Sequence, residues 1–366
     1  MQELELLLAD SARALSASWG RPVLLTHPET LRTQSRSLVV RARVVGGGQV
    51  RSIVLKRFRD EPVCGLDDWA GLVFLQQRGM RFVPRFLAGS EEARLFVMED
   101  VGRGQSLEDL LRGDDASAAG RALLATTRLT SVMHIRTLSA QSDYDSVRQA
   151  IAPRHERVRI ENARYLLDHA GRLRRWLAEL DVQEHPGTQK DLEQIARELA
   201  DPGPFLAFTH GDLAPSNVLF THQGPLLLDF EYAGMRHSLY DALMWLLTVP
   251  LPDELISRAD LLYRGSLSQA CYAAQVDSEY LRARAMVAAS RTVNLFQWIS
   301  PKALEREREW APGLSQRAAL LRHLERLRAM LEPLDPVPAL SRTLNSLEAR
   351  LRERWSVEPF IWPAFR

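Results

Sequence analysis

The apolar positions in the first hundred residues predict one small sheet and two helices. Residues 2–19 and 66–78 repeat apolar side chains every three or four positions, as amphipathic helices do, and each stretch ends at a glycine. Short runs rich in β-branched and aromatic residues predict five strands, at 22–25, 38–45, 50–58, 82–87 and 94–99. Gly46, Gly47 and Gly48 predict a tight hairpin turn between the second and third runs, because glycine reaches positive φ without steric cost.

Helical periodicity dominates after residue 107 and is interrupted once. Spacings of three and four predict helices over 117–137, 155–180, 189–200, 239–249, 253–272, 277–299 and 313–331. The interruption is a polar segment at residues 208–231, where two short apolar strands flank polar loops. Loops that rigid strands hold in place often carry catalytic groups. The pattern predicts an α+β chain, with a small five-stranded antiparallel sheet over residues 1–99 and a larger, mostly helical part over residues 100–366.

The composition excludes several classes of protein. The chain has 366 residues, of which 46% are apolar and 25% charged, which suits a globular core and not a disordered chain. Its 47 basic and 46 acidic residues leave a net charge of +1, so no basic stripe for nucleic acid is indicated. Cys64 and Cys271 match no metal or disulfide spacing, which favours a reducing compartment. The acidic N-terminal residues and the short apolar runs lead us to expect a cytoplasmic protein without a membrane segment.

Lysine is rare in this sequence. Only Lys56, Lys190 and Lys302 occur among the 47 basic residues, so arginine supplies nearly all of the positive charge. Lys56 follows three apolar residues in a predicted strand. A solvated position at the edge of the sheet would be the natural interpretation if lysine were common here. Its rarity favours a chemical role for Lys56.

The polar segment carries oxygen ligands and a candidate base. Asp212 and Asn217 lie five residues apart, and Asp229 follows the apolar run 226–228. Carboxylate and amide oxygens suit Mg²⁺, which binds few protein ligands and also coordinates the phosphate oxygens of a substrate. Phosphoryl transfer also needs a carboxylate that accepts the proton of the acceptor hydroxyl. Each residue alone is as well explained as a helix cap or a turn residue, and His210 as a buried loop histidine, but the whole set in this order favours phosphoryl transfer.

Two stretches of this segment resemble a known superfamily. His210-Gly-Asp-Leu-Ala-Pro-Ser-Asn217 resembles the catalytic loop of aminoglycoside phosphotransferases and choline kinases, in which an asparagine follows the aspartate of His-x-Asp by five residues. Leu227-Leu-Asp-Phe-Glu-Tyr-Ala233 resembles their metal-binding segment, and the order of strand, lysine and helix agrees over about residues 20–245. The resemblance implies a bilobal, protein-kinase-like fold and an ATP- and Mg²⁺-dependent transfer of the γ-phosphoryl group to a small molecule.

The resemblance also implies a role for each matched position of the polar segment. Asp212 is the expected catalytic base, which orients and deprotonates the acceptor hydroxyl. Asn217 and Asp229 are the expected ligands of magnesium on the nucleotide phosphates.

Lys56 is the expected contact to the α- and β-phosphates. The superfamily pairs this lysine with an acid of the next helix, usually glutamate. The apolar face of the predicted helix makes Asp68 the best candidate, while Asp67 and Glu61 remain alternatives.

Two loops are expected to complete the nucleotide site. The hinge at residues 96–100 is expected to face adenine through the backbone of Glu99 and Val101. No Gly-x-Gly-x-x-Gly lies between the first and second strands, so we assign the phosphate cover to residues 33–37. Backbone N–H groups there and the hydroxyls of Ser35 or Ser37 are the candidate phosphate contacts.

The acceptor is expected to be a small molecule with a hydroxyl group. Only eleven residues separate Asp229 from Asp241, too few for the activation segment of a protein kinase, and Gly211 stands where protein kinases usually carry arginine. The metal-binding segment is similar to that of choline and ethanolamine kinases, whereas His210-Gly-Asp equally suits aminoglycoside kinases and relatives that act on sugars or amino alcohols. Candidate walls of the acceptor site are Glu231, Tyr232, Trp245 and Trp298.

A catalytically silent, kinase-like nucleotide-binding protein is the alternative function. Such a protein would keep the fold and lose the lysine or a metal ligand, whereas this sequence retains all four positions. The sequence does not specify an oligomeric state.

Overall fold

The computed structural model describes residues 2–59, 62–299, 305–311 and 313–366, and the chain folds into two compact units. Unit 1 consists of Met1–Glu108, Gln141–His155 and His210–Gly234. Unit 2 consists of Asp109–Ala140, Glu156–Thr209 and Met235–Arg366. Nearly all of the polar segment therefore belongs to the same unit as the N-terminal sheet. The division into residues 1–99 and 100–366 is a different partition of the chain and stays a prediction.

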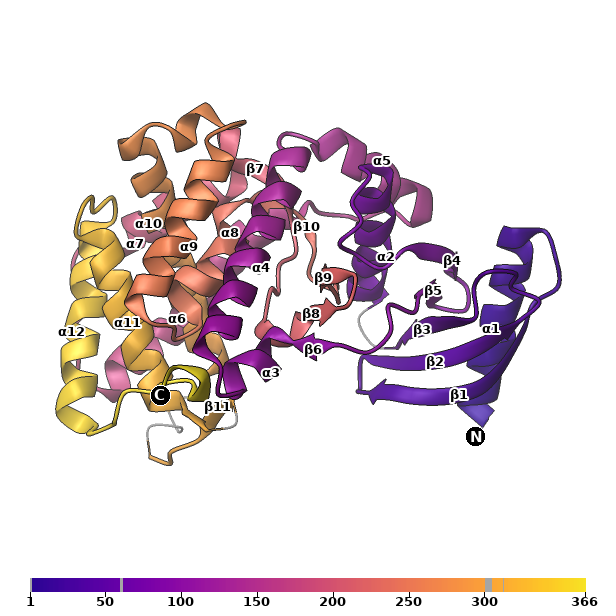
Figure 1. Cartoon of the computed structure of the whole chain (residues 1–366). Helices are drawn as coiled ribbons and strands as arrows, with labels where there is room; N and C mark the ends of the chain where they lie inside the picture. The colour runs from indigo at the N-terminus through magenta and orange to yellow at the C-terminus, as the bar shows by residue number, and fades with distance from the viewer. Residues whose placement is uncertain (1, 60–61, 300–304, 312) are drawn as a thin grey trace. The chain divides into compact units, whose positions relative to one another are not determined.

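Unit 1 contains the predicted five-stranded antiparallel sheet, which confirms the α+β fold class (Figure 1). The strands are β1 (Leu24–Thr33), β2 (Ser37–Val45), β3 (Ser52–Phe58), β4 (Phe86–Ser90) and β5 (Leu95–Glu99). Their order is β1-β2-β3-β5-β4, and each neighbouring pair is antiparallel. β1 extends to residue 33 instead of ending at 25, because this edge strand is largely exposed and lacks the alternating pattern that marks a half-buried strand.

The two faces of the sheet have different partners. Helix α1 (Gln2–Trp19) covers one face, where Leu7 and Leu15 pack with Val40, Leu55 and Val97 in a buried core. Side chains alternate between faces along a strand, so the residues next to these in β2, β3 and β5 point to the opposite face. Lys56 lies on that opposite face.

The rest of unit 1 joins this sheet to the polar segment. Helices α2 (Pro62–Gln77) and α5 (Gln141–Ile151) pack against each other. A second sheet has the order β6-β8-β9, from strands β6 (Gln105–Ser106), β8 (Val218–Thr221) and β9 (Gly224–Leu227). The 3₁₀ turn η2 (Pro215–Asn217) precedes β8. The Leu227 N–H of β9 donates to the carbonyl of Phe82, in the chain between α2 and β4, at 2.8 Å.

Unit 2 is mostly helical. Its helices are α4 (Ala116–Thr137), α6 (Val158–Glu179), α7 (Thr188–Ala200), α8 (Leu239–Leu243), α9 (Asp253–Leu267), α10 (Asp277–Trp298), α11 (Gln316–Leu331) and α12 (Pro338–Arg354), and the short α3 (Leu107–Arg112) runs across the unit boundary. The 3₁₀ turns are η1 (Gly203–Phe205), η4 (Tyr272–Ala274) and η6 (Pro363–Phe365), and a π-helical turn, η3 (Met244–Thr248), continues α8. Short strand pairs are β7 (Leu206–Thr209) with β10 (Gly234–His237), and β11 (Glu309–Ala311) with β12 (Leu314–Ser315).

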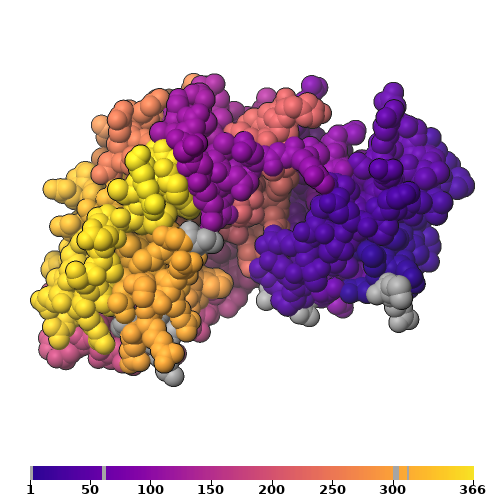
Figure 2. Space-filling model, turned by 60° about the horizontal axis from the view of Figure 1, so that its bottom comes forward, coloured from indigo at the N-terminus to yellow at the C-terminus, as the bar shows by residue number. Residues whose placement is uncertain are grey.

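The end of the chain packs onto the preceding helix. α11 and α12 are in contact, and the space-filling view shows the yellow C-terminal segment lying on the orange one before it (Figure 2). Neither α12 nor α5 is among the predicted helices.

No helix in the described ranges combines the length and the apolar character that a bilayer crossing requires.

Candidate active site

The side chain of Lys56 lies between two carboxylates in unit 1. On β3 it pairs with Val39 of β2 and Phe96 of β5, in the middle of the sheet, and it is 6% exposed. Its Nζ donates to Asp68 Oδ2 at 2.6 Å and to Asp229 Oδ1 at 2.5 Å. The predicted contact between Lys56 and Asp68 is therefore present, while its part in nucleotide binding stays a prediction.

Asp68 has a second contact, to the backbone of the polar segment. Its Oδ1 accepts a hydrogen bond from the backbone N–H of Phe230 at 3.0 Å, so one carboxylate of α2 holds both Lys56 and the residue after Asp229. A buried carboxylate that satisfies two donors fixes the positions of both.

The two alternatives to Asp68 lie elsewhere. Asp67 accepts from Arg148 Nε at 2.9 Å and from Arg154, which ties α2 to α5 and the chain after it. Adjacent residues on a helix point about 100° apart, which explains why Asp67 and Asp68 have separate partners. Glu61 lies outside the described residues.

Asp229 adopts a backbone conformation that is unusual for a residue other than glycine. Its φ is +67°, in the left-handed region, which costs energy and persists only where surrounding contacts stabilise it. Asp229 bonds Lys56 and, through Oδ2, Arg32 Nη1 at 3.1 Å. Together with the Phe230 N–H bond to Asp68, these contacts hold its carboxylate on the Lys56 face of the sheet.

The charges of this cluster shift the pKa of its members. Burial alone would lower the pKa of Lys56, but the carboxylates of Asp68 and Asp229 outweigh it and raise that pKa above its ordinary value. For Asp229 burial would raise the pKa, and the charges of Lys56 and Arg32 lower it instead. Burial and the charge of Asp229 raise the pKa of Glu231. Lys56 and Asp229 therefore remain an ion pair at neutral pH.

The loop with Asp212 is packed tightly against the segment that follows Asp229. The buried ring of His210 donates from Nε2 to the Leu228 carbonyl at 2.8 Å, and its centroid lies 4.5 Å from that of the Phe230 ring, with the two rings tilted by 38°. Gly211 has a φ of +85°, and a Cβ there would lie 2.0 Å from the carbonyl oxygen of Tyr232. Only glycine fits this approach of two backbones.

Asn217 is oriented by the residue five positions before it. Its Nδ2 donates to the backbone carbonyl of Asp212 at 2.8 Å, and its own carbonyl accepts from the Leu228 N–H at 2.9 Å. Because the amide nitrogen is used in this way, Oδ1 is the atom that Asn217 offers to a ligand.

The oxygen atoms of Asn217 and Asp229 suit a cation that also binds phosphate oxygens. Within the described part of the chain, no group of three or more His, Cys, Asp or Glu side chains forms a metal cage. Mg²⁺ does not require one, because it binds through one or two protein oxygens and completes its shell with water and phosphate oxygens. The Asn217 amide oxygen and the Asp229 carboxylate fit that requirement.

The predicted hinge is fixed by Asp100. This carboxylate accepts hydrogen bonds from Ser52 Oγ at 2.7 Å, from Arg41 Nε at 2.9 Å and from the Gly102 N–H at 3.0 Å. Burial would raise the pKa of Asp100, but these bonds lower it. The Glu99 N–H donates to the Arg85 carbonyl at 2.8 Å, and Val101 is a partly buried residue in the irregular stretch that follows β5. Their contact with adenine stays a prediction.

The hairpin tip predicted as the phosphate cover joins β1 to β2. Ser35 is exposed at the tip and Ser37 is the buried first residue of β2. Residues 229–232 form an acidic segment after β9. Among the described residues, the hydrogen bonds from this hairpin to the acidic segment come from Arg32 and Arg36 and not from the serines. The sequence interpretation missed these arginines, whose only signal is their position on either side of the turn.

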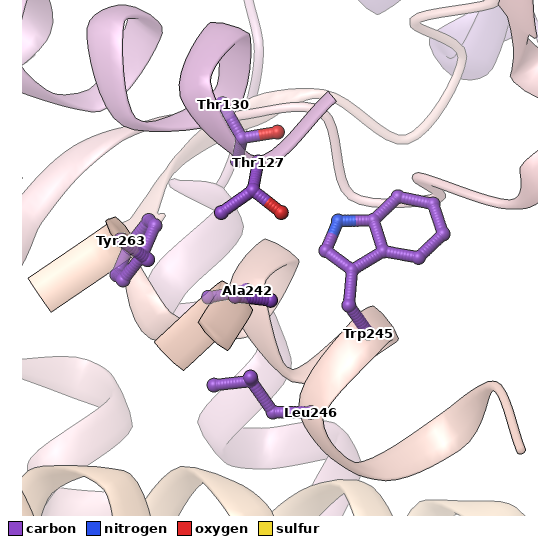
Figure 3. Close-up of a pocket in the computed structure, with 7 residues that line it drawn as sticks. Thr127, Thr130, Ala242, Trp245, Leu246 and Tyr263 are labelled. Atoms are coloured by element: carbon purple, nitrogen blue, oxygen red, sulfur yellow. The ribbon is translucent and has the colours of Figure 1, made fainter. Parts of the chain in front are cut away.

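Two of the candidate acceptor residues lie in unit 2 and differ in exposure. Trp298 is 70% exposed, whereas Trp245 is buried in a crevice too narrow to admit water. The crevice is lined by Thr127, Thr130, Ala242, Trp245, Leu246, Ala259 and Tyr263 (Figure 3). Trp245 therefore packs as a core residue.

Comparisons with known proteins identify the family of the chain. A model of the phosphotransferase enzyme family matches residues 40–274, which include Lys56, Asp212 and Asp229. A search of curated proteins found no match.

The solved structures that are similar to the chain include the following three. The choline kinase LicA from Streptococcus pneumoniae has a TM-score of 0.48 and 15% identity, covering 87% of this chain and 94% of that one. The choline/ethanolamine kinase family protein from Mesorhizobium loti has a TM-score of 0.48 and 16% identity, covering 88% and 93%. APH(2")-IIa, in its complex with streptomycin and ATP, has a TM-score of 0.48 and 14% identity, covering 78% and 90%.

Proposed function

The chain belongs to the phosphotransferase enzyme family, and we propose that it transfers the γ-phosphoryl group of ATP to a hydroxyl group of a small molecule. The observation that carries this proposal is the position of Lys56. In a chain with three lysines, the one in unit 1 is buried and bonded at 2.6 and 2.5 Å to Asp68 and Asp229. A buried ammonium with a raised pKa is a permanent positive charge, which suits a contact to phosphates.

In this proposal the polar segment provides the metal ligands. The Asn217 amide oxygen and the Asp229 carboxylate would hold Mg²⁺, which supplies charge neutralisation on the phosphates when it is bound. Lys56 binds the α- and β-phosphates, and Asp68 positions Lys56 and the Phe230 backbone without touching the nucleotide. Glu99 and Val101 would bind adenine through their backbones.

Asp212 would accept the proton of the acceptor hydroxyl. Its loop is held by the Asn217 amide at 2.8 Å and by the backbone contact of Gly211, so the position of its carboxylate depends on packing within unit 1. We propose an amino alcohol, an aminoglycoside or a sugar-like molecule as the acceptor.

A panel of these acceptors tests the proposal. The purified chain is incubated with Mg-ATP and each compound, and ADP release and the mass of the product are measured. Asp212→Asn should lower turnover by about a thousandfold, because it removes the proton acceptor, and should leave ATP affinity within about twofold. Equal turnover in the variant and the wild type would reject Asp212 as the base. A rise in melting temperature with Mg-ATP but no product from any acceptor would favour a silent nucleotide-binding protein.

A further inference from the structure

Two arginines beside the β1–β2 turn contact the acidic segment that follows β9. Arg32 Nη1 donates to Asp229 Oδ2 at 3.1 Å, and Arg36 Nη2 lies 3.1 Å from Glu231 Oε1. Arg36 also donates to the hydroxyl of Tyr232, and its guanidinium lies 5.5 Å above that ring. All of these residues belong to unit 1. The hairpin thus places one cation on the proposed metal ligand Asp229 and a second on Glu231, two residues later.

A β-bulge places Arg32 on this side of the sheet. Thr30 pairs with Val40 and Arg32 with Val39, so β1 has one extra residue between two successive partners on β2. Paired residues of an antiparallel sheet share a face, and Val39 pairs in turn with Lys56. Without the bulge, Arg32 would share the face of Val40, which packs toward α1. With it, Arg32 shares the face of Lys56, two strands and about 10 Å away.

The turn between the arginines is anchored to the end of β3. The Gln34 N–H donates to the Ser37 carbonyl at 2.9 Å, and the Arg59 N–H donates to the Arg36 carbonyl at 2.8 Å. The Arg59 side chain donates to the Gln34 carbonyl at 3.0 Å. Because three bonds fix this turn, the arginines extend from a defined backbone.

The arginines are accessible, unlike the lysine beneath them. The side chains of Arg32 and Arg36 are 52% and 34% exposed, whereas that of Lys56 is 6% exposed. In this cluster three carboxylates face three cations, namely Asp68, Asp229 and Glu231 with Lys56, Arg32 and Arg36. A divalent cation on Asp229 would take over as its counterion and release the Arg32 Nη1 group, which donates to Asp229. A guanidinium binds phosphate oxygens through two parallel N–H groups, so a polyphosphate is the partner that suits it.

From this arrangement we propose that Arg32 and Arg36 bind the terminal phosphates of the nucleotide, exchanging the carboxylates of Asp229 and Glu231 for phosphate oxygens. The inference rests on the proposed function and assigns phosphate binding at this hairpin to arginine side chains rather than to the hydroxyls of Ser35 and Ser37.

The test measures nucleotide affinity rather than turnover. Arg32→Gln, Arg36→Gln and Arg32→Lys are compared with wild type by titration of the full chain with AMP, ADP and ATP in the presence of Mg²⁺. Each Gln variant should lose about tenfold or more in ATP affinity and less than about twofold in AMP affinity, because a charge-assisted hydrogen bond to phosphate is lost. Arg32→Lys should recover part of the loss. Arg43→Gln is the matched control, since Arg43 is an exposed arginine on the same hairpin, and it should bind all three nucleotides as wild type does.

The outcomes separate this inference from the proposed function. A wild-type chain that binds no Mg-ATP would reject the proposed function itself. A wild type that binds ATP, with Gln variants that match it or lose AMP and ATP equally, would overturn the inference alone. Tighter ATP binding by Arg32→Gln would also overturn it, because the arginine would then obstruct the metal ligand.

Discussion

Replacing Asp68 with asparagine should destabilise unit 1, because its two oxygens serve two donors. Oδ2 accepts from Lys56 at 2.6 Å and Oδ1 from the Phe230 N–H at 3.0 Å, in a side chain that is 4% exposed. Asparagine keeps the shape but has one oxygen. In either rotamer its NH₂ group faces a donor, so one buried donor loses its partner.

The size of this effect follows from what Lys56 retains. Removing one partner of a buried ion pair costs about 3–5 kcal/mol, and an unsatisfied buried donor about 1–3 kcal/mol. Lys56 keeps Asp229 at 2.5 Å, so we expect a loss of about 2–3 kcal/mol for Asp68→Asn. Lys56→Met should also destabilise, because it removes the cation that pairs with the buried carboxylate of Asp68 and leaves Asp229 with Arg32 alone. The double variant removes both charges and should be at least about 1 kcal/mol more stable than the sum of the single effects predicts.

Denaturant unfolding of the four proteins measures this coupling, and hydrogen exchange of the β3 amides reports unit 1 separately. Lys190→Met is the control, since Lys190 is an exposed lysine of α7, and it should change the free energy of unfolding by less than about 0.5 kcal/mol. Additivity of the single effects within about 0.5 kcal/mol would refute the reasoning, because coupled residues do not add.

Two further predictions concern the catalytic loop and acid stability. Gly211→Ala should lower turnover at least about a hundredfold, because its Cβ would meet the Tyr232 carbonyl at 2.0 Å, whereas Gly171→Ala in α6, with open space around it, should leave turnover unchanged. Burial lowers the pKa of both His237 and His323 to about 3, so the unfolded chain binds protons that the folded chain does not. The free energy of unfolding of unit 2 should therefore fall as the pH drops below about 6.5, by roughly 4 kcal/mol between pH 7 and 5, and a pH-independent denaturation midpoint over that range would contradict the prediction.

The sequence was informative where one local signal determined the structure. The runs at 38–45, 50–58 and 94–99 identified β2, β3 and β5 closely, because these strands are bounded by turn residues, whereas the runs at 22–25 and 82–87 overlap β1 and β4 only in part. The Lys56–Asp68 contact was expected because the resemblance implies an acid of the next helix as the partner of the lysine, and the apolar residues of α2 favoured Asp68 among the acids. α5 carries a weaker signal, since Tyr144, Val147 and Ile151 are its only large apolar residues. α12 does carry one, in leucines spaced three and four apart, and could have been predicted.

The contacts of Arg32 could not be predicted from local patterns. β1 is an edge strand whose residues are mostly exposed, so its extent is set by pairing with β2 and not by its own periodicity. The bulge that turns Arg32 toward Asp229 exists only once that pairing is made, and the two residues are 197 positions apart. A register shift of one residue reverses the face of a side chain, which sequence spacing alone does not reveal.

The aspartate at position 68, where the resemblance implies glutamate, has a physical explanation in this chain. The φ of +67° at Asp229 costs about 1 kcal/mol or more, and the next N–H, that of Phe230, is bonded to Asp68 at 3.0 Å. A hydrogen bond to a buried charged acceptor contributes about 1.5–3 kcal/mol, enough to offset this strain. A carboxylate on a short side chain can hold this N–H and Lys56 together only because α2 lies close to both. The position of α2 thereby determines the orientation of the lysine and of the proposed metal ligand at once.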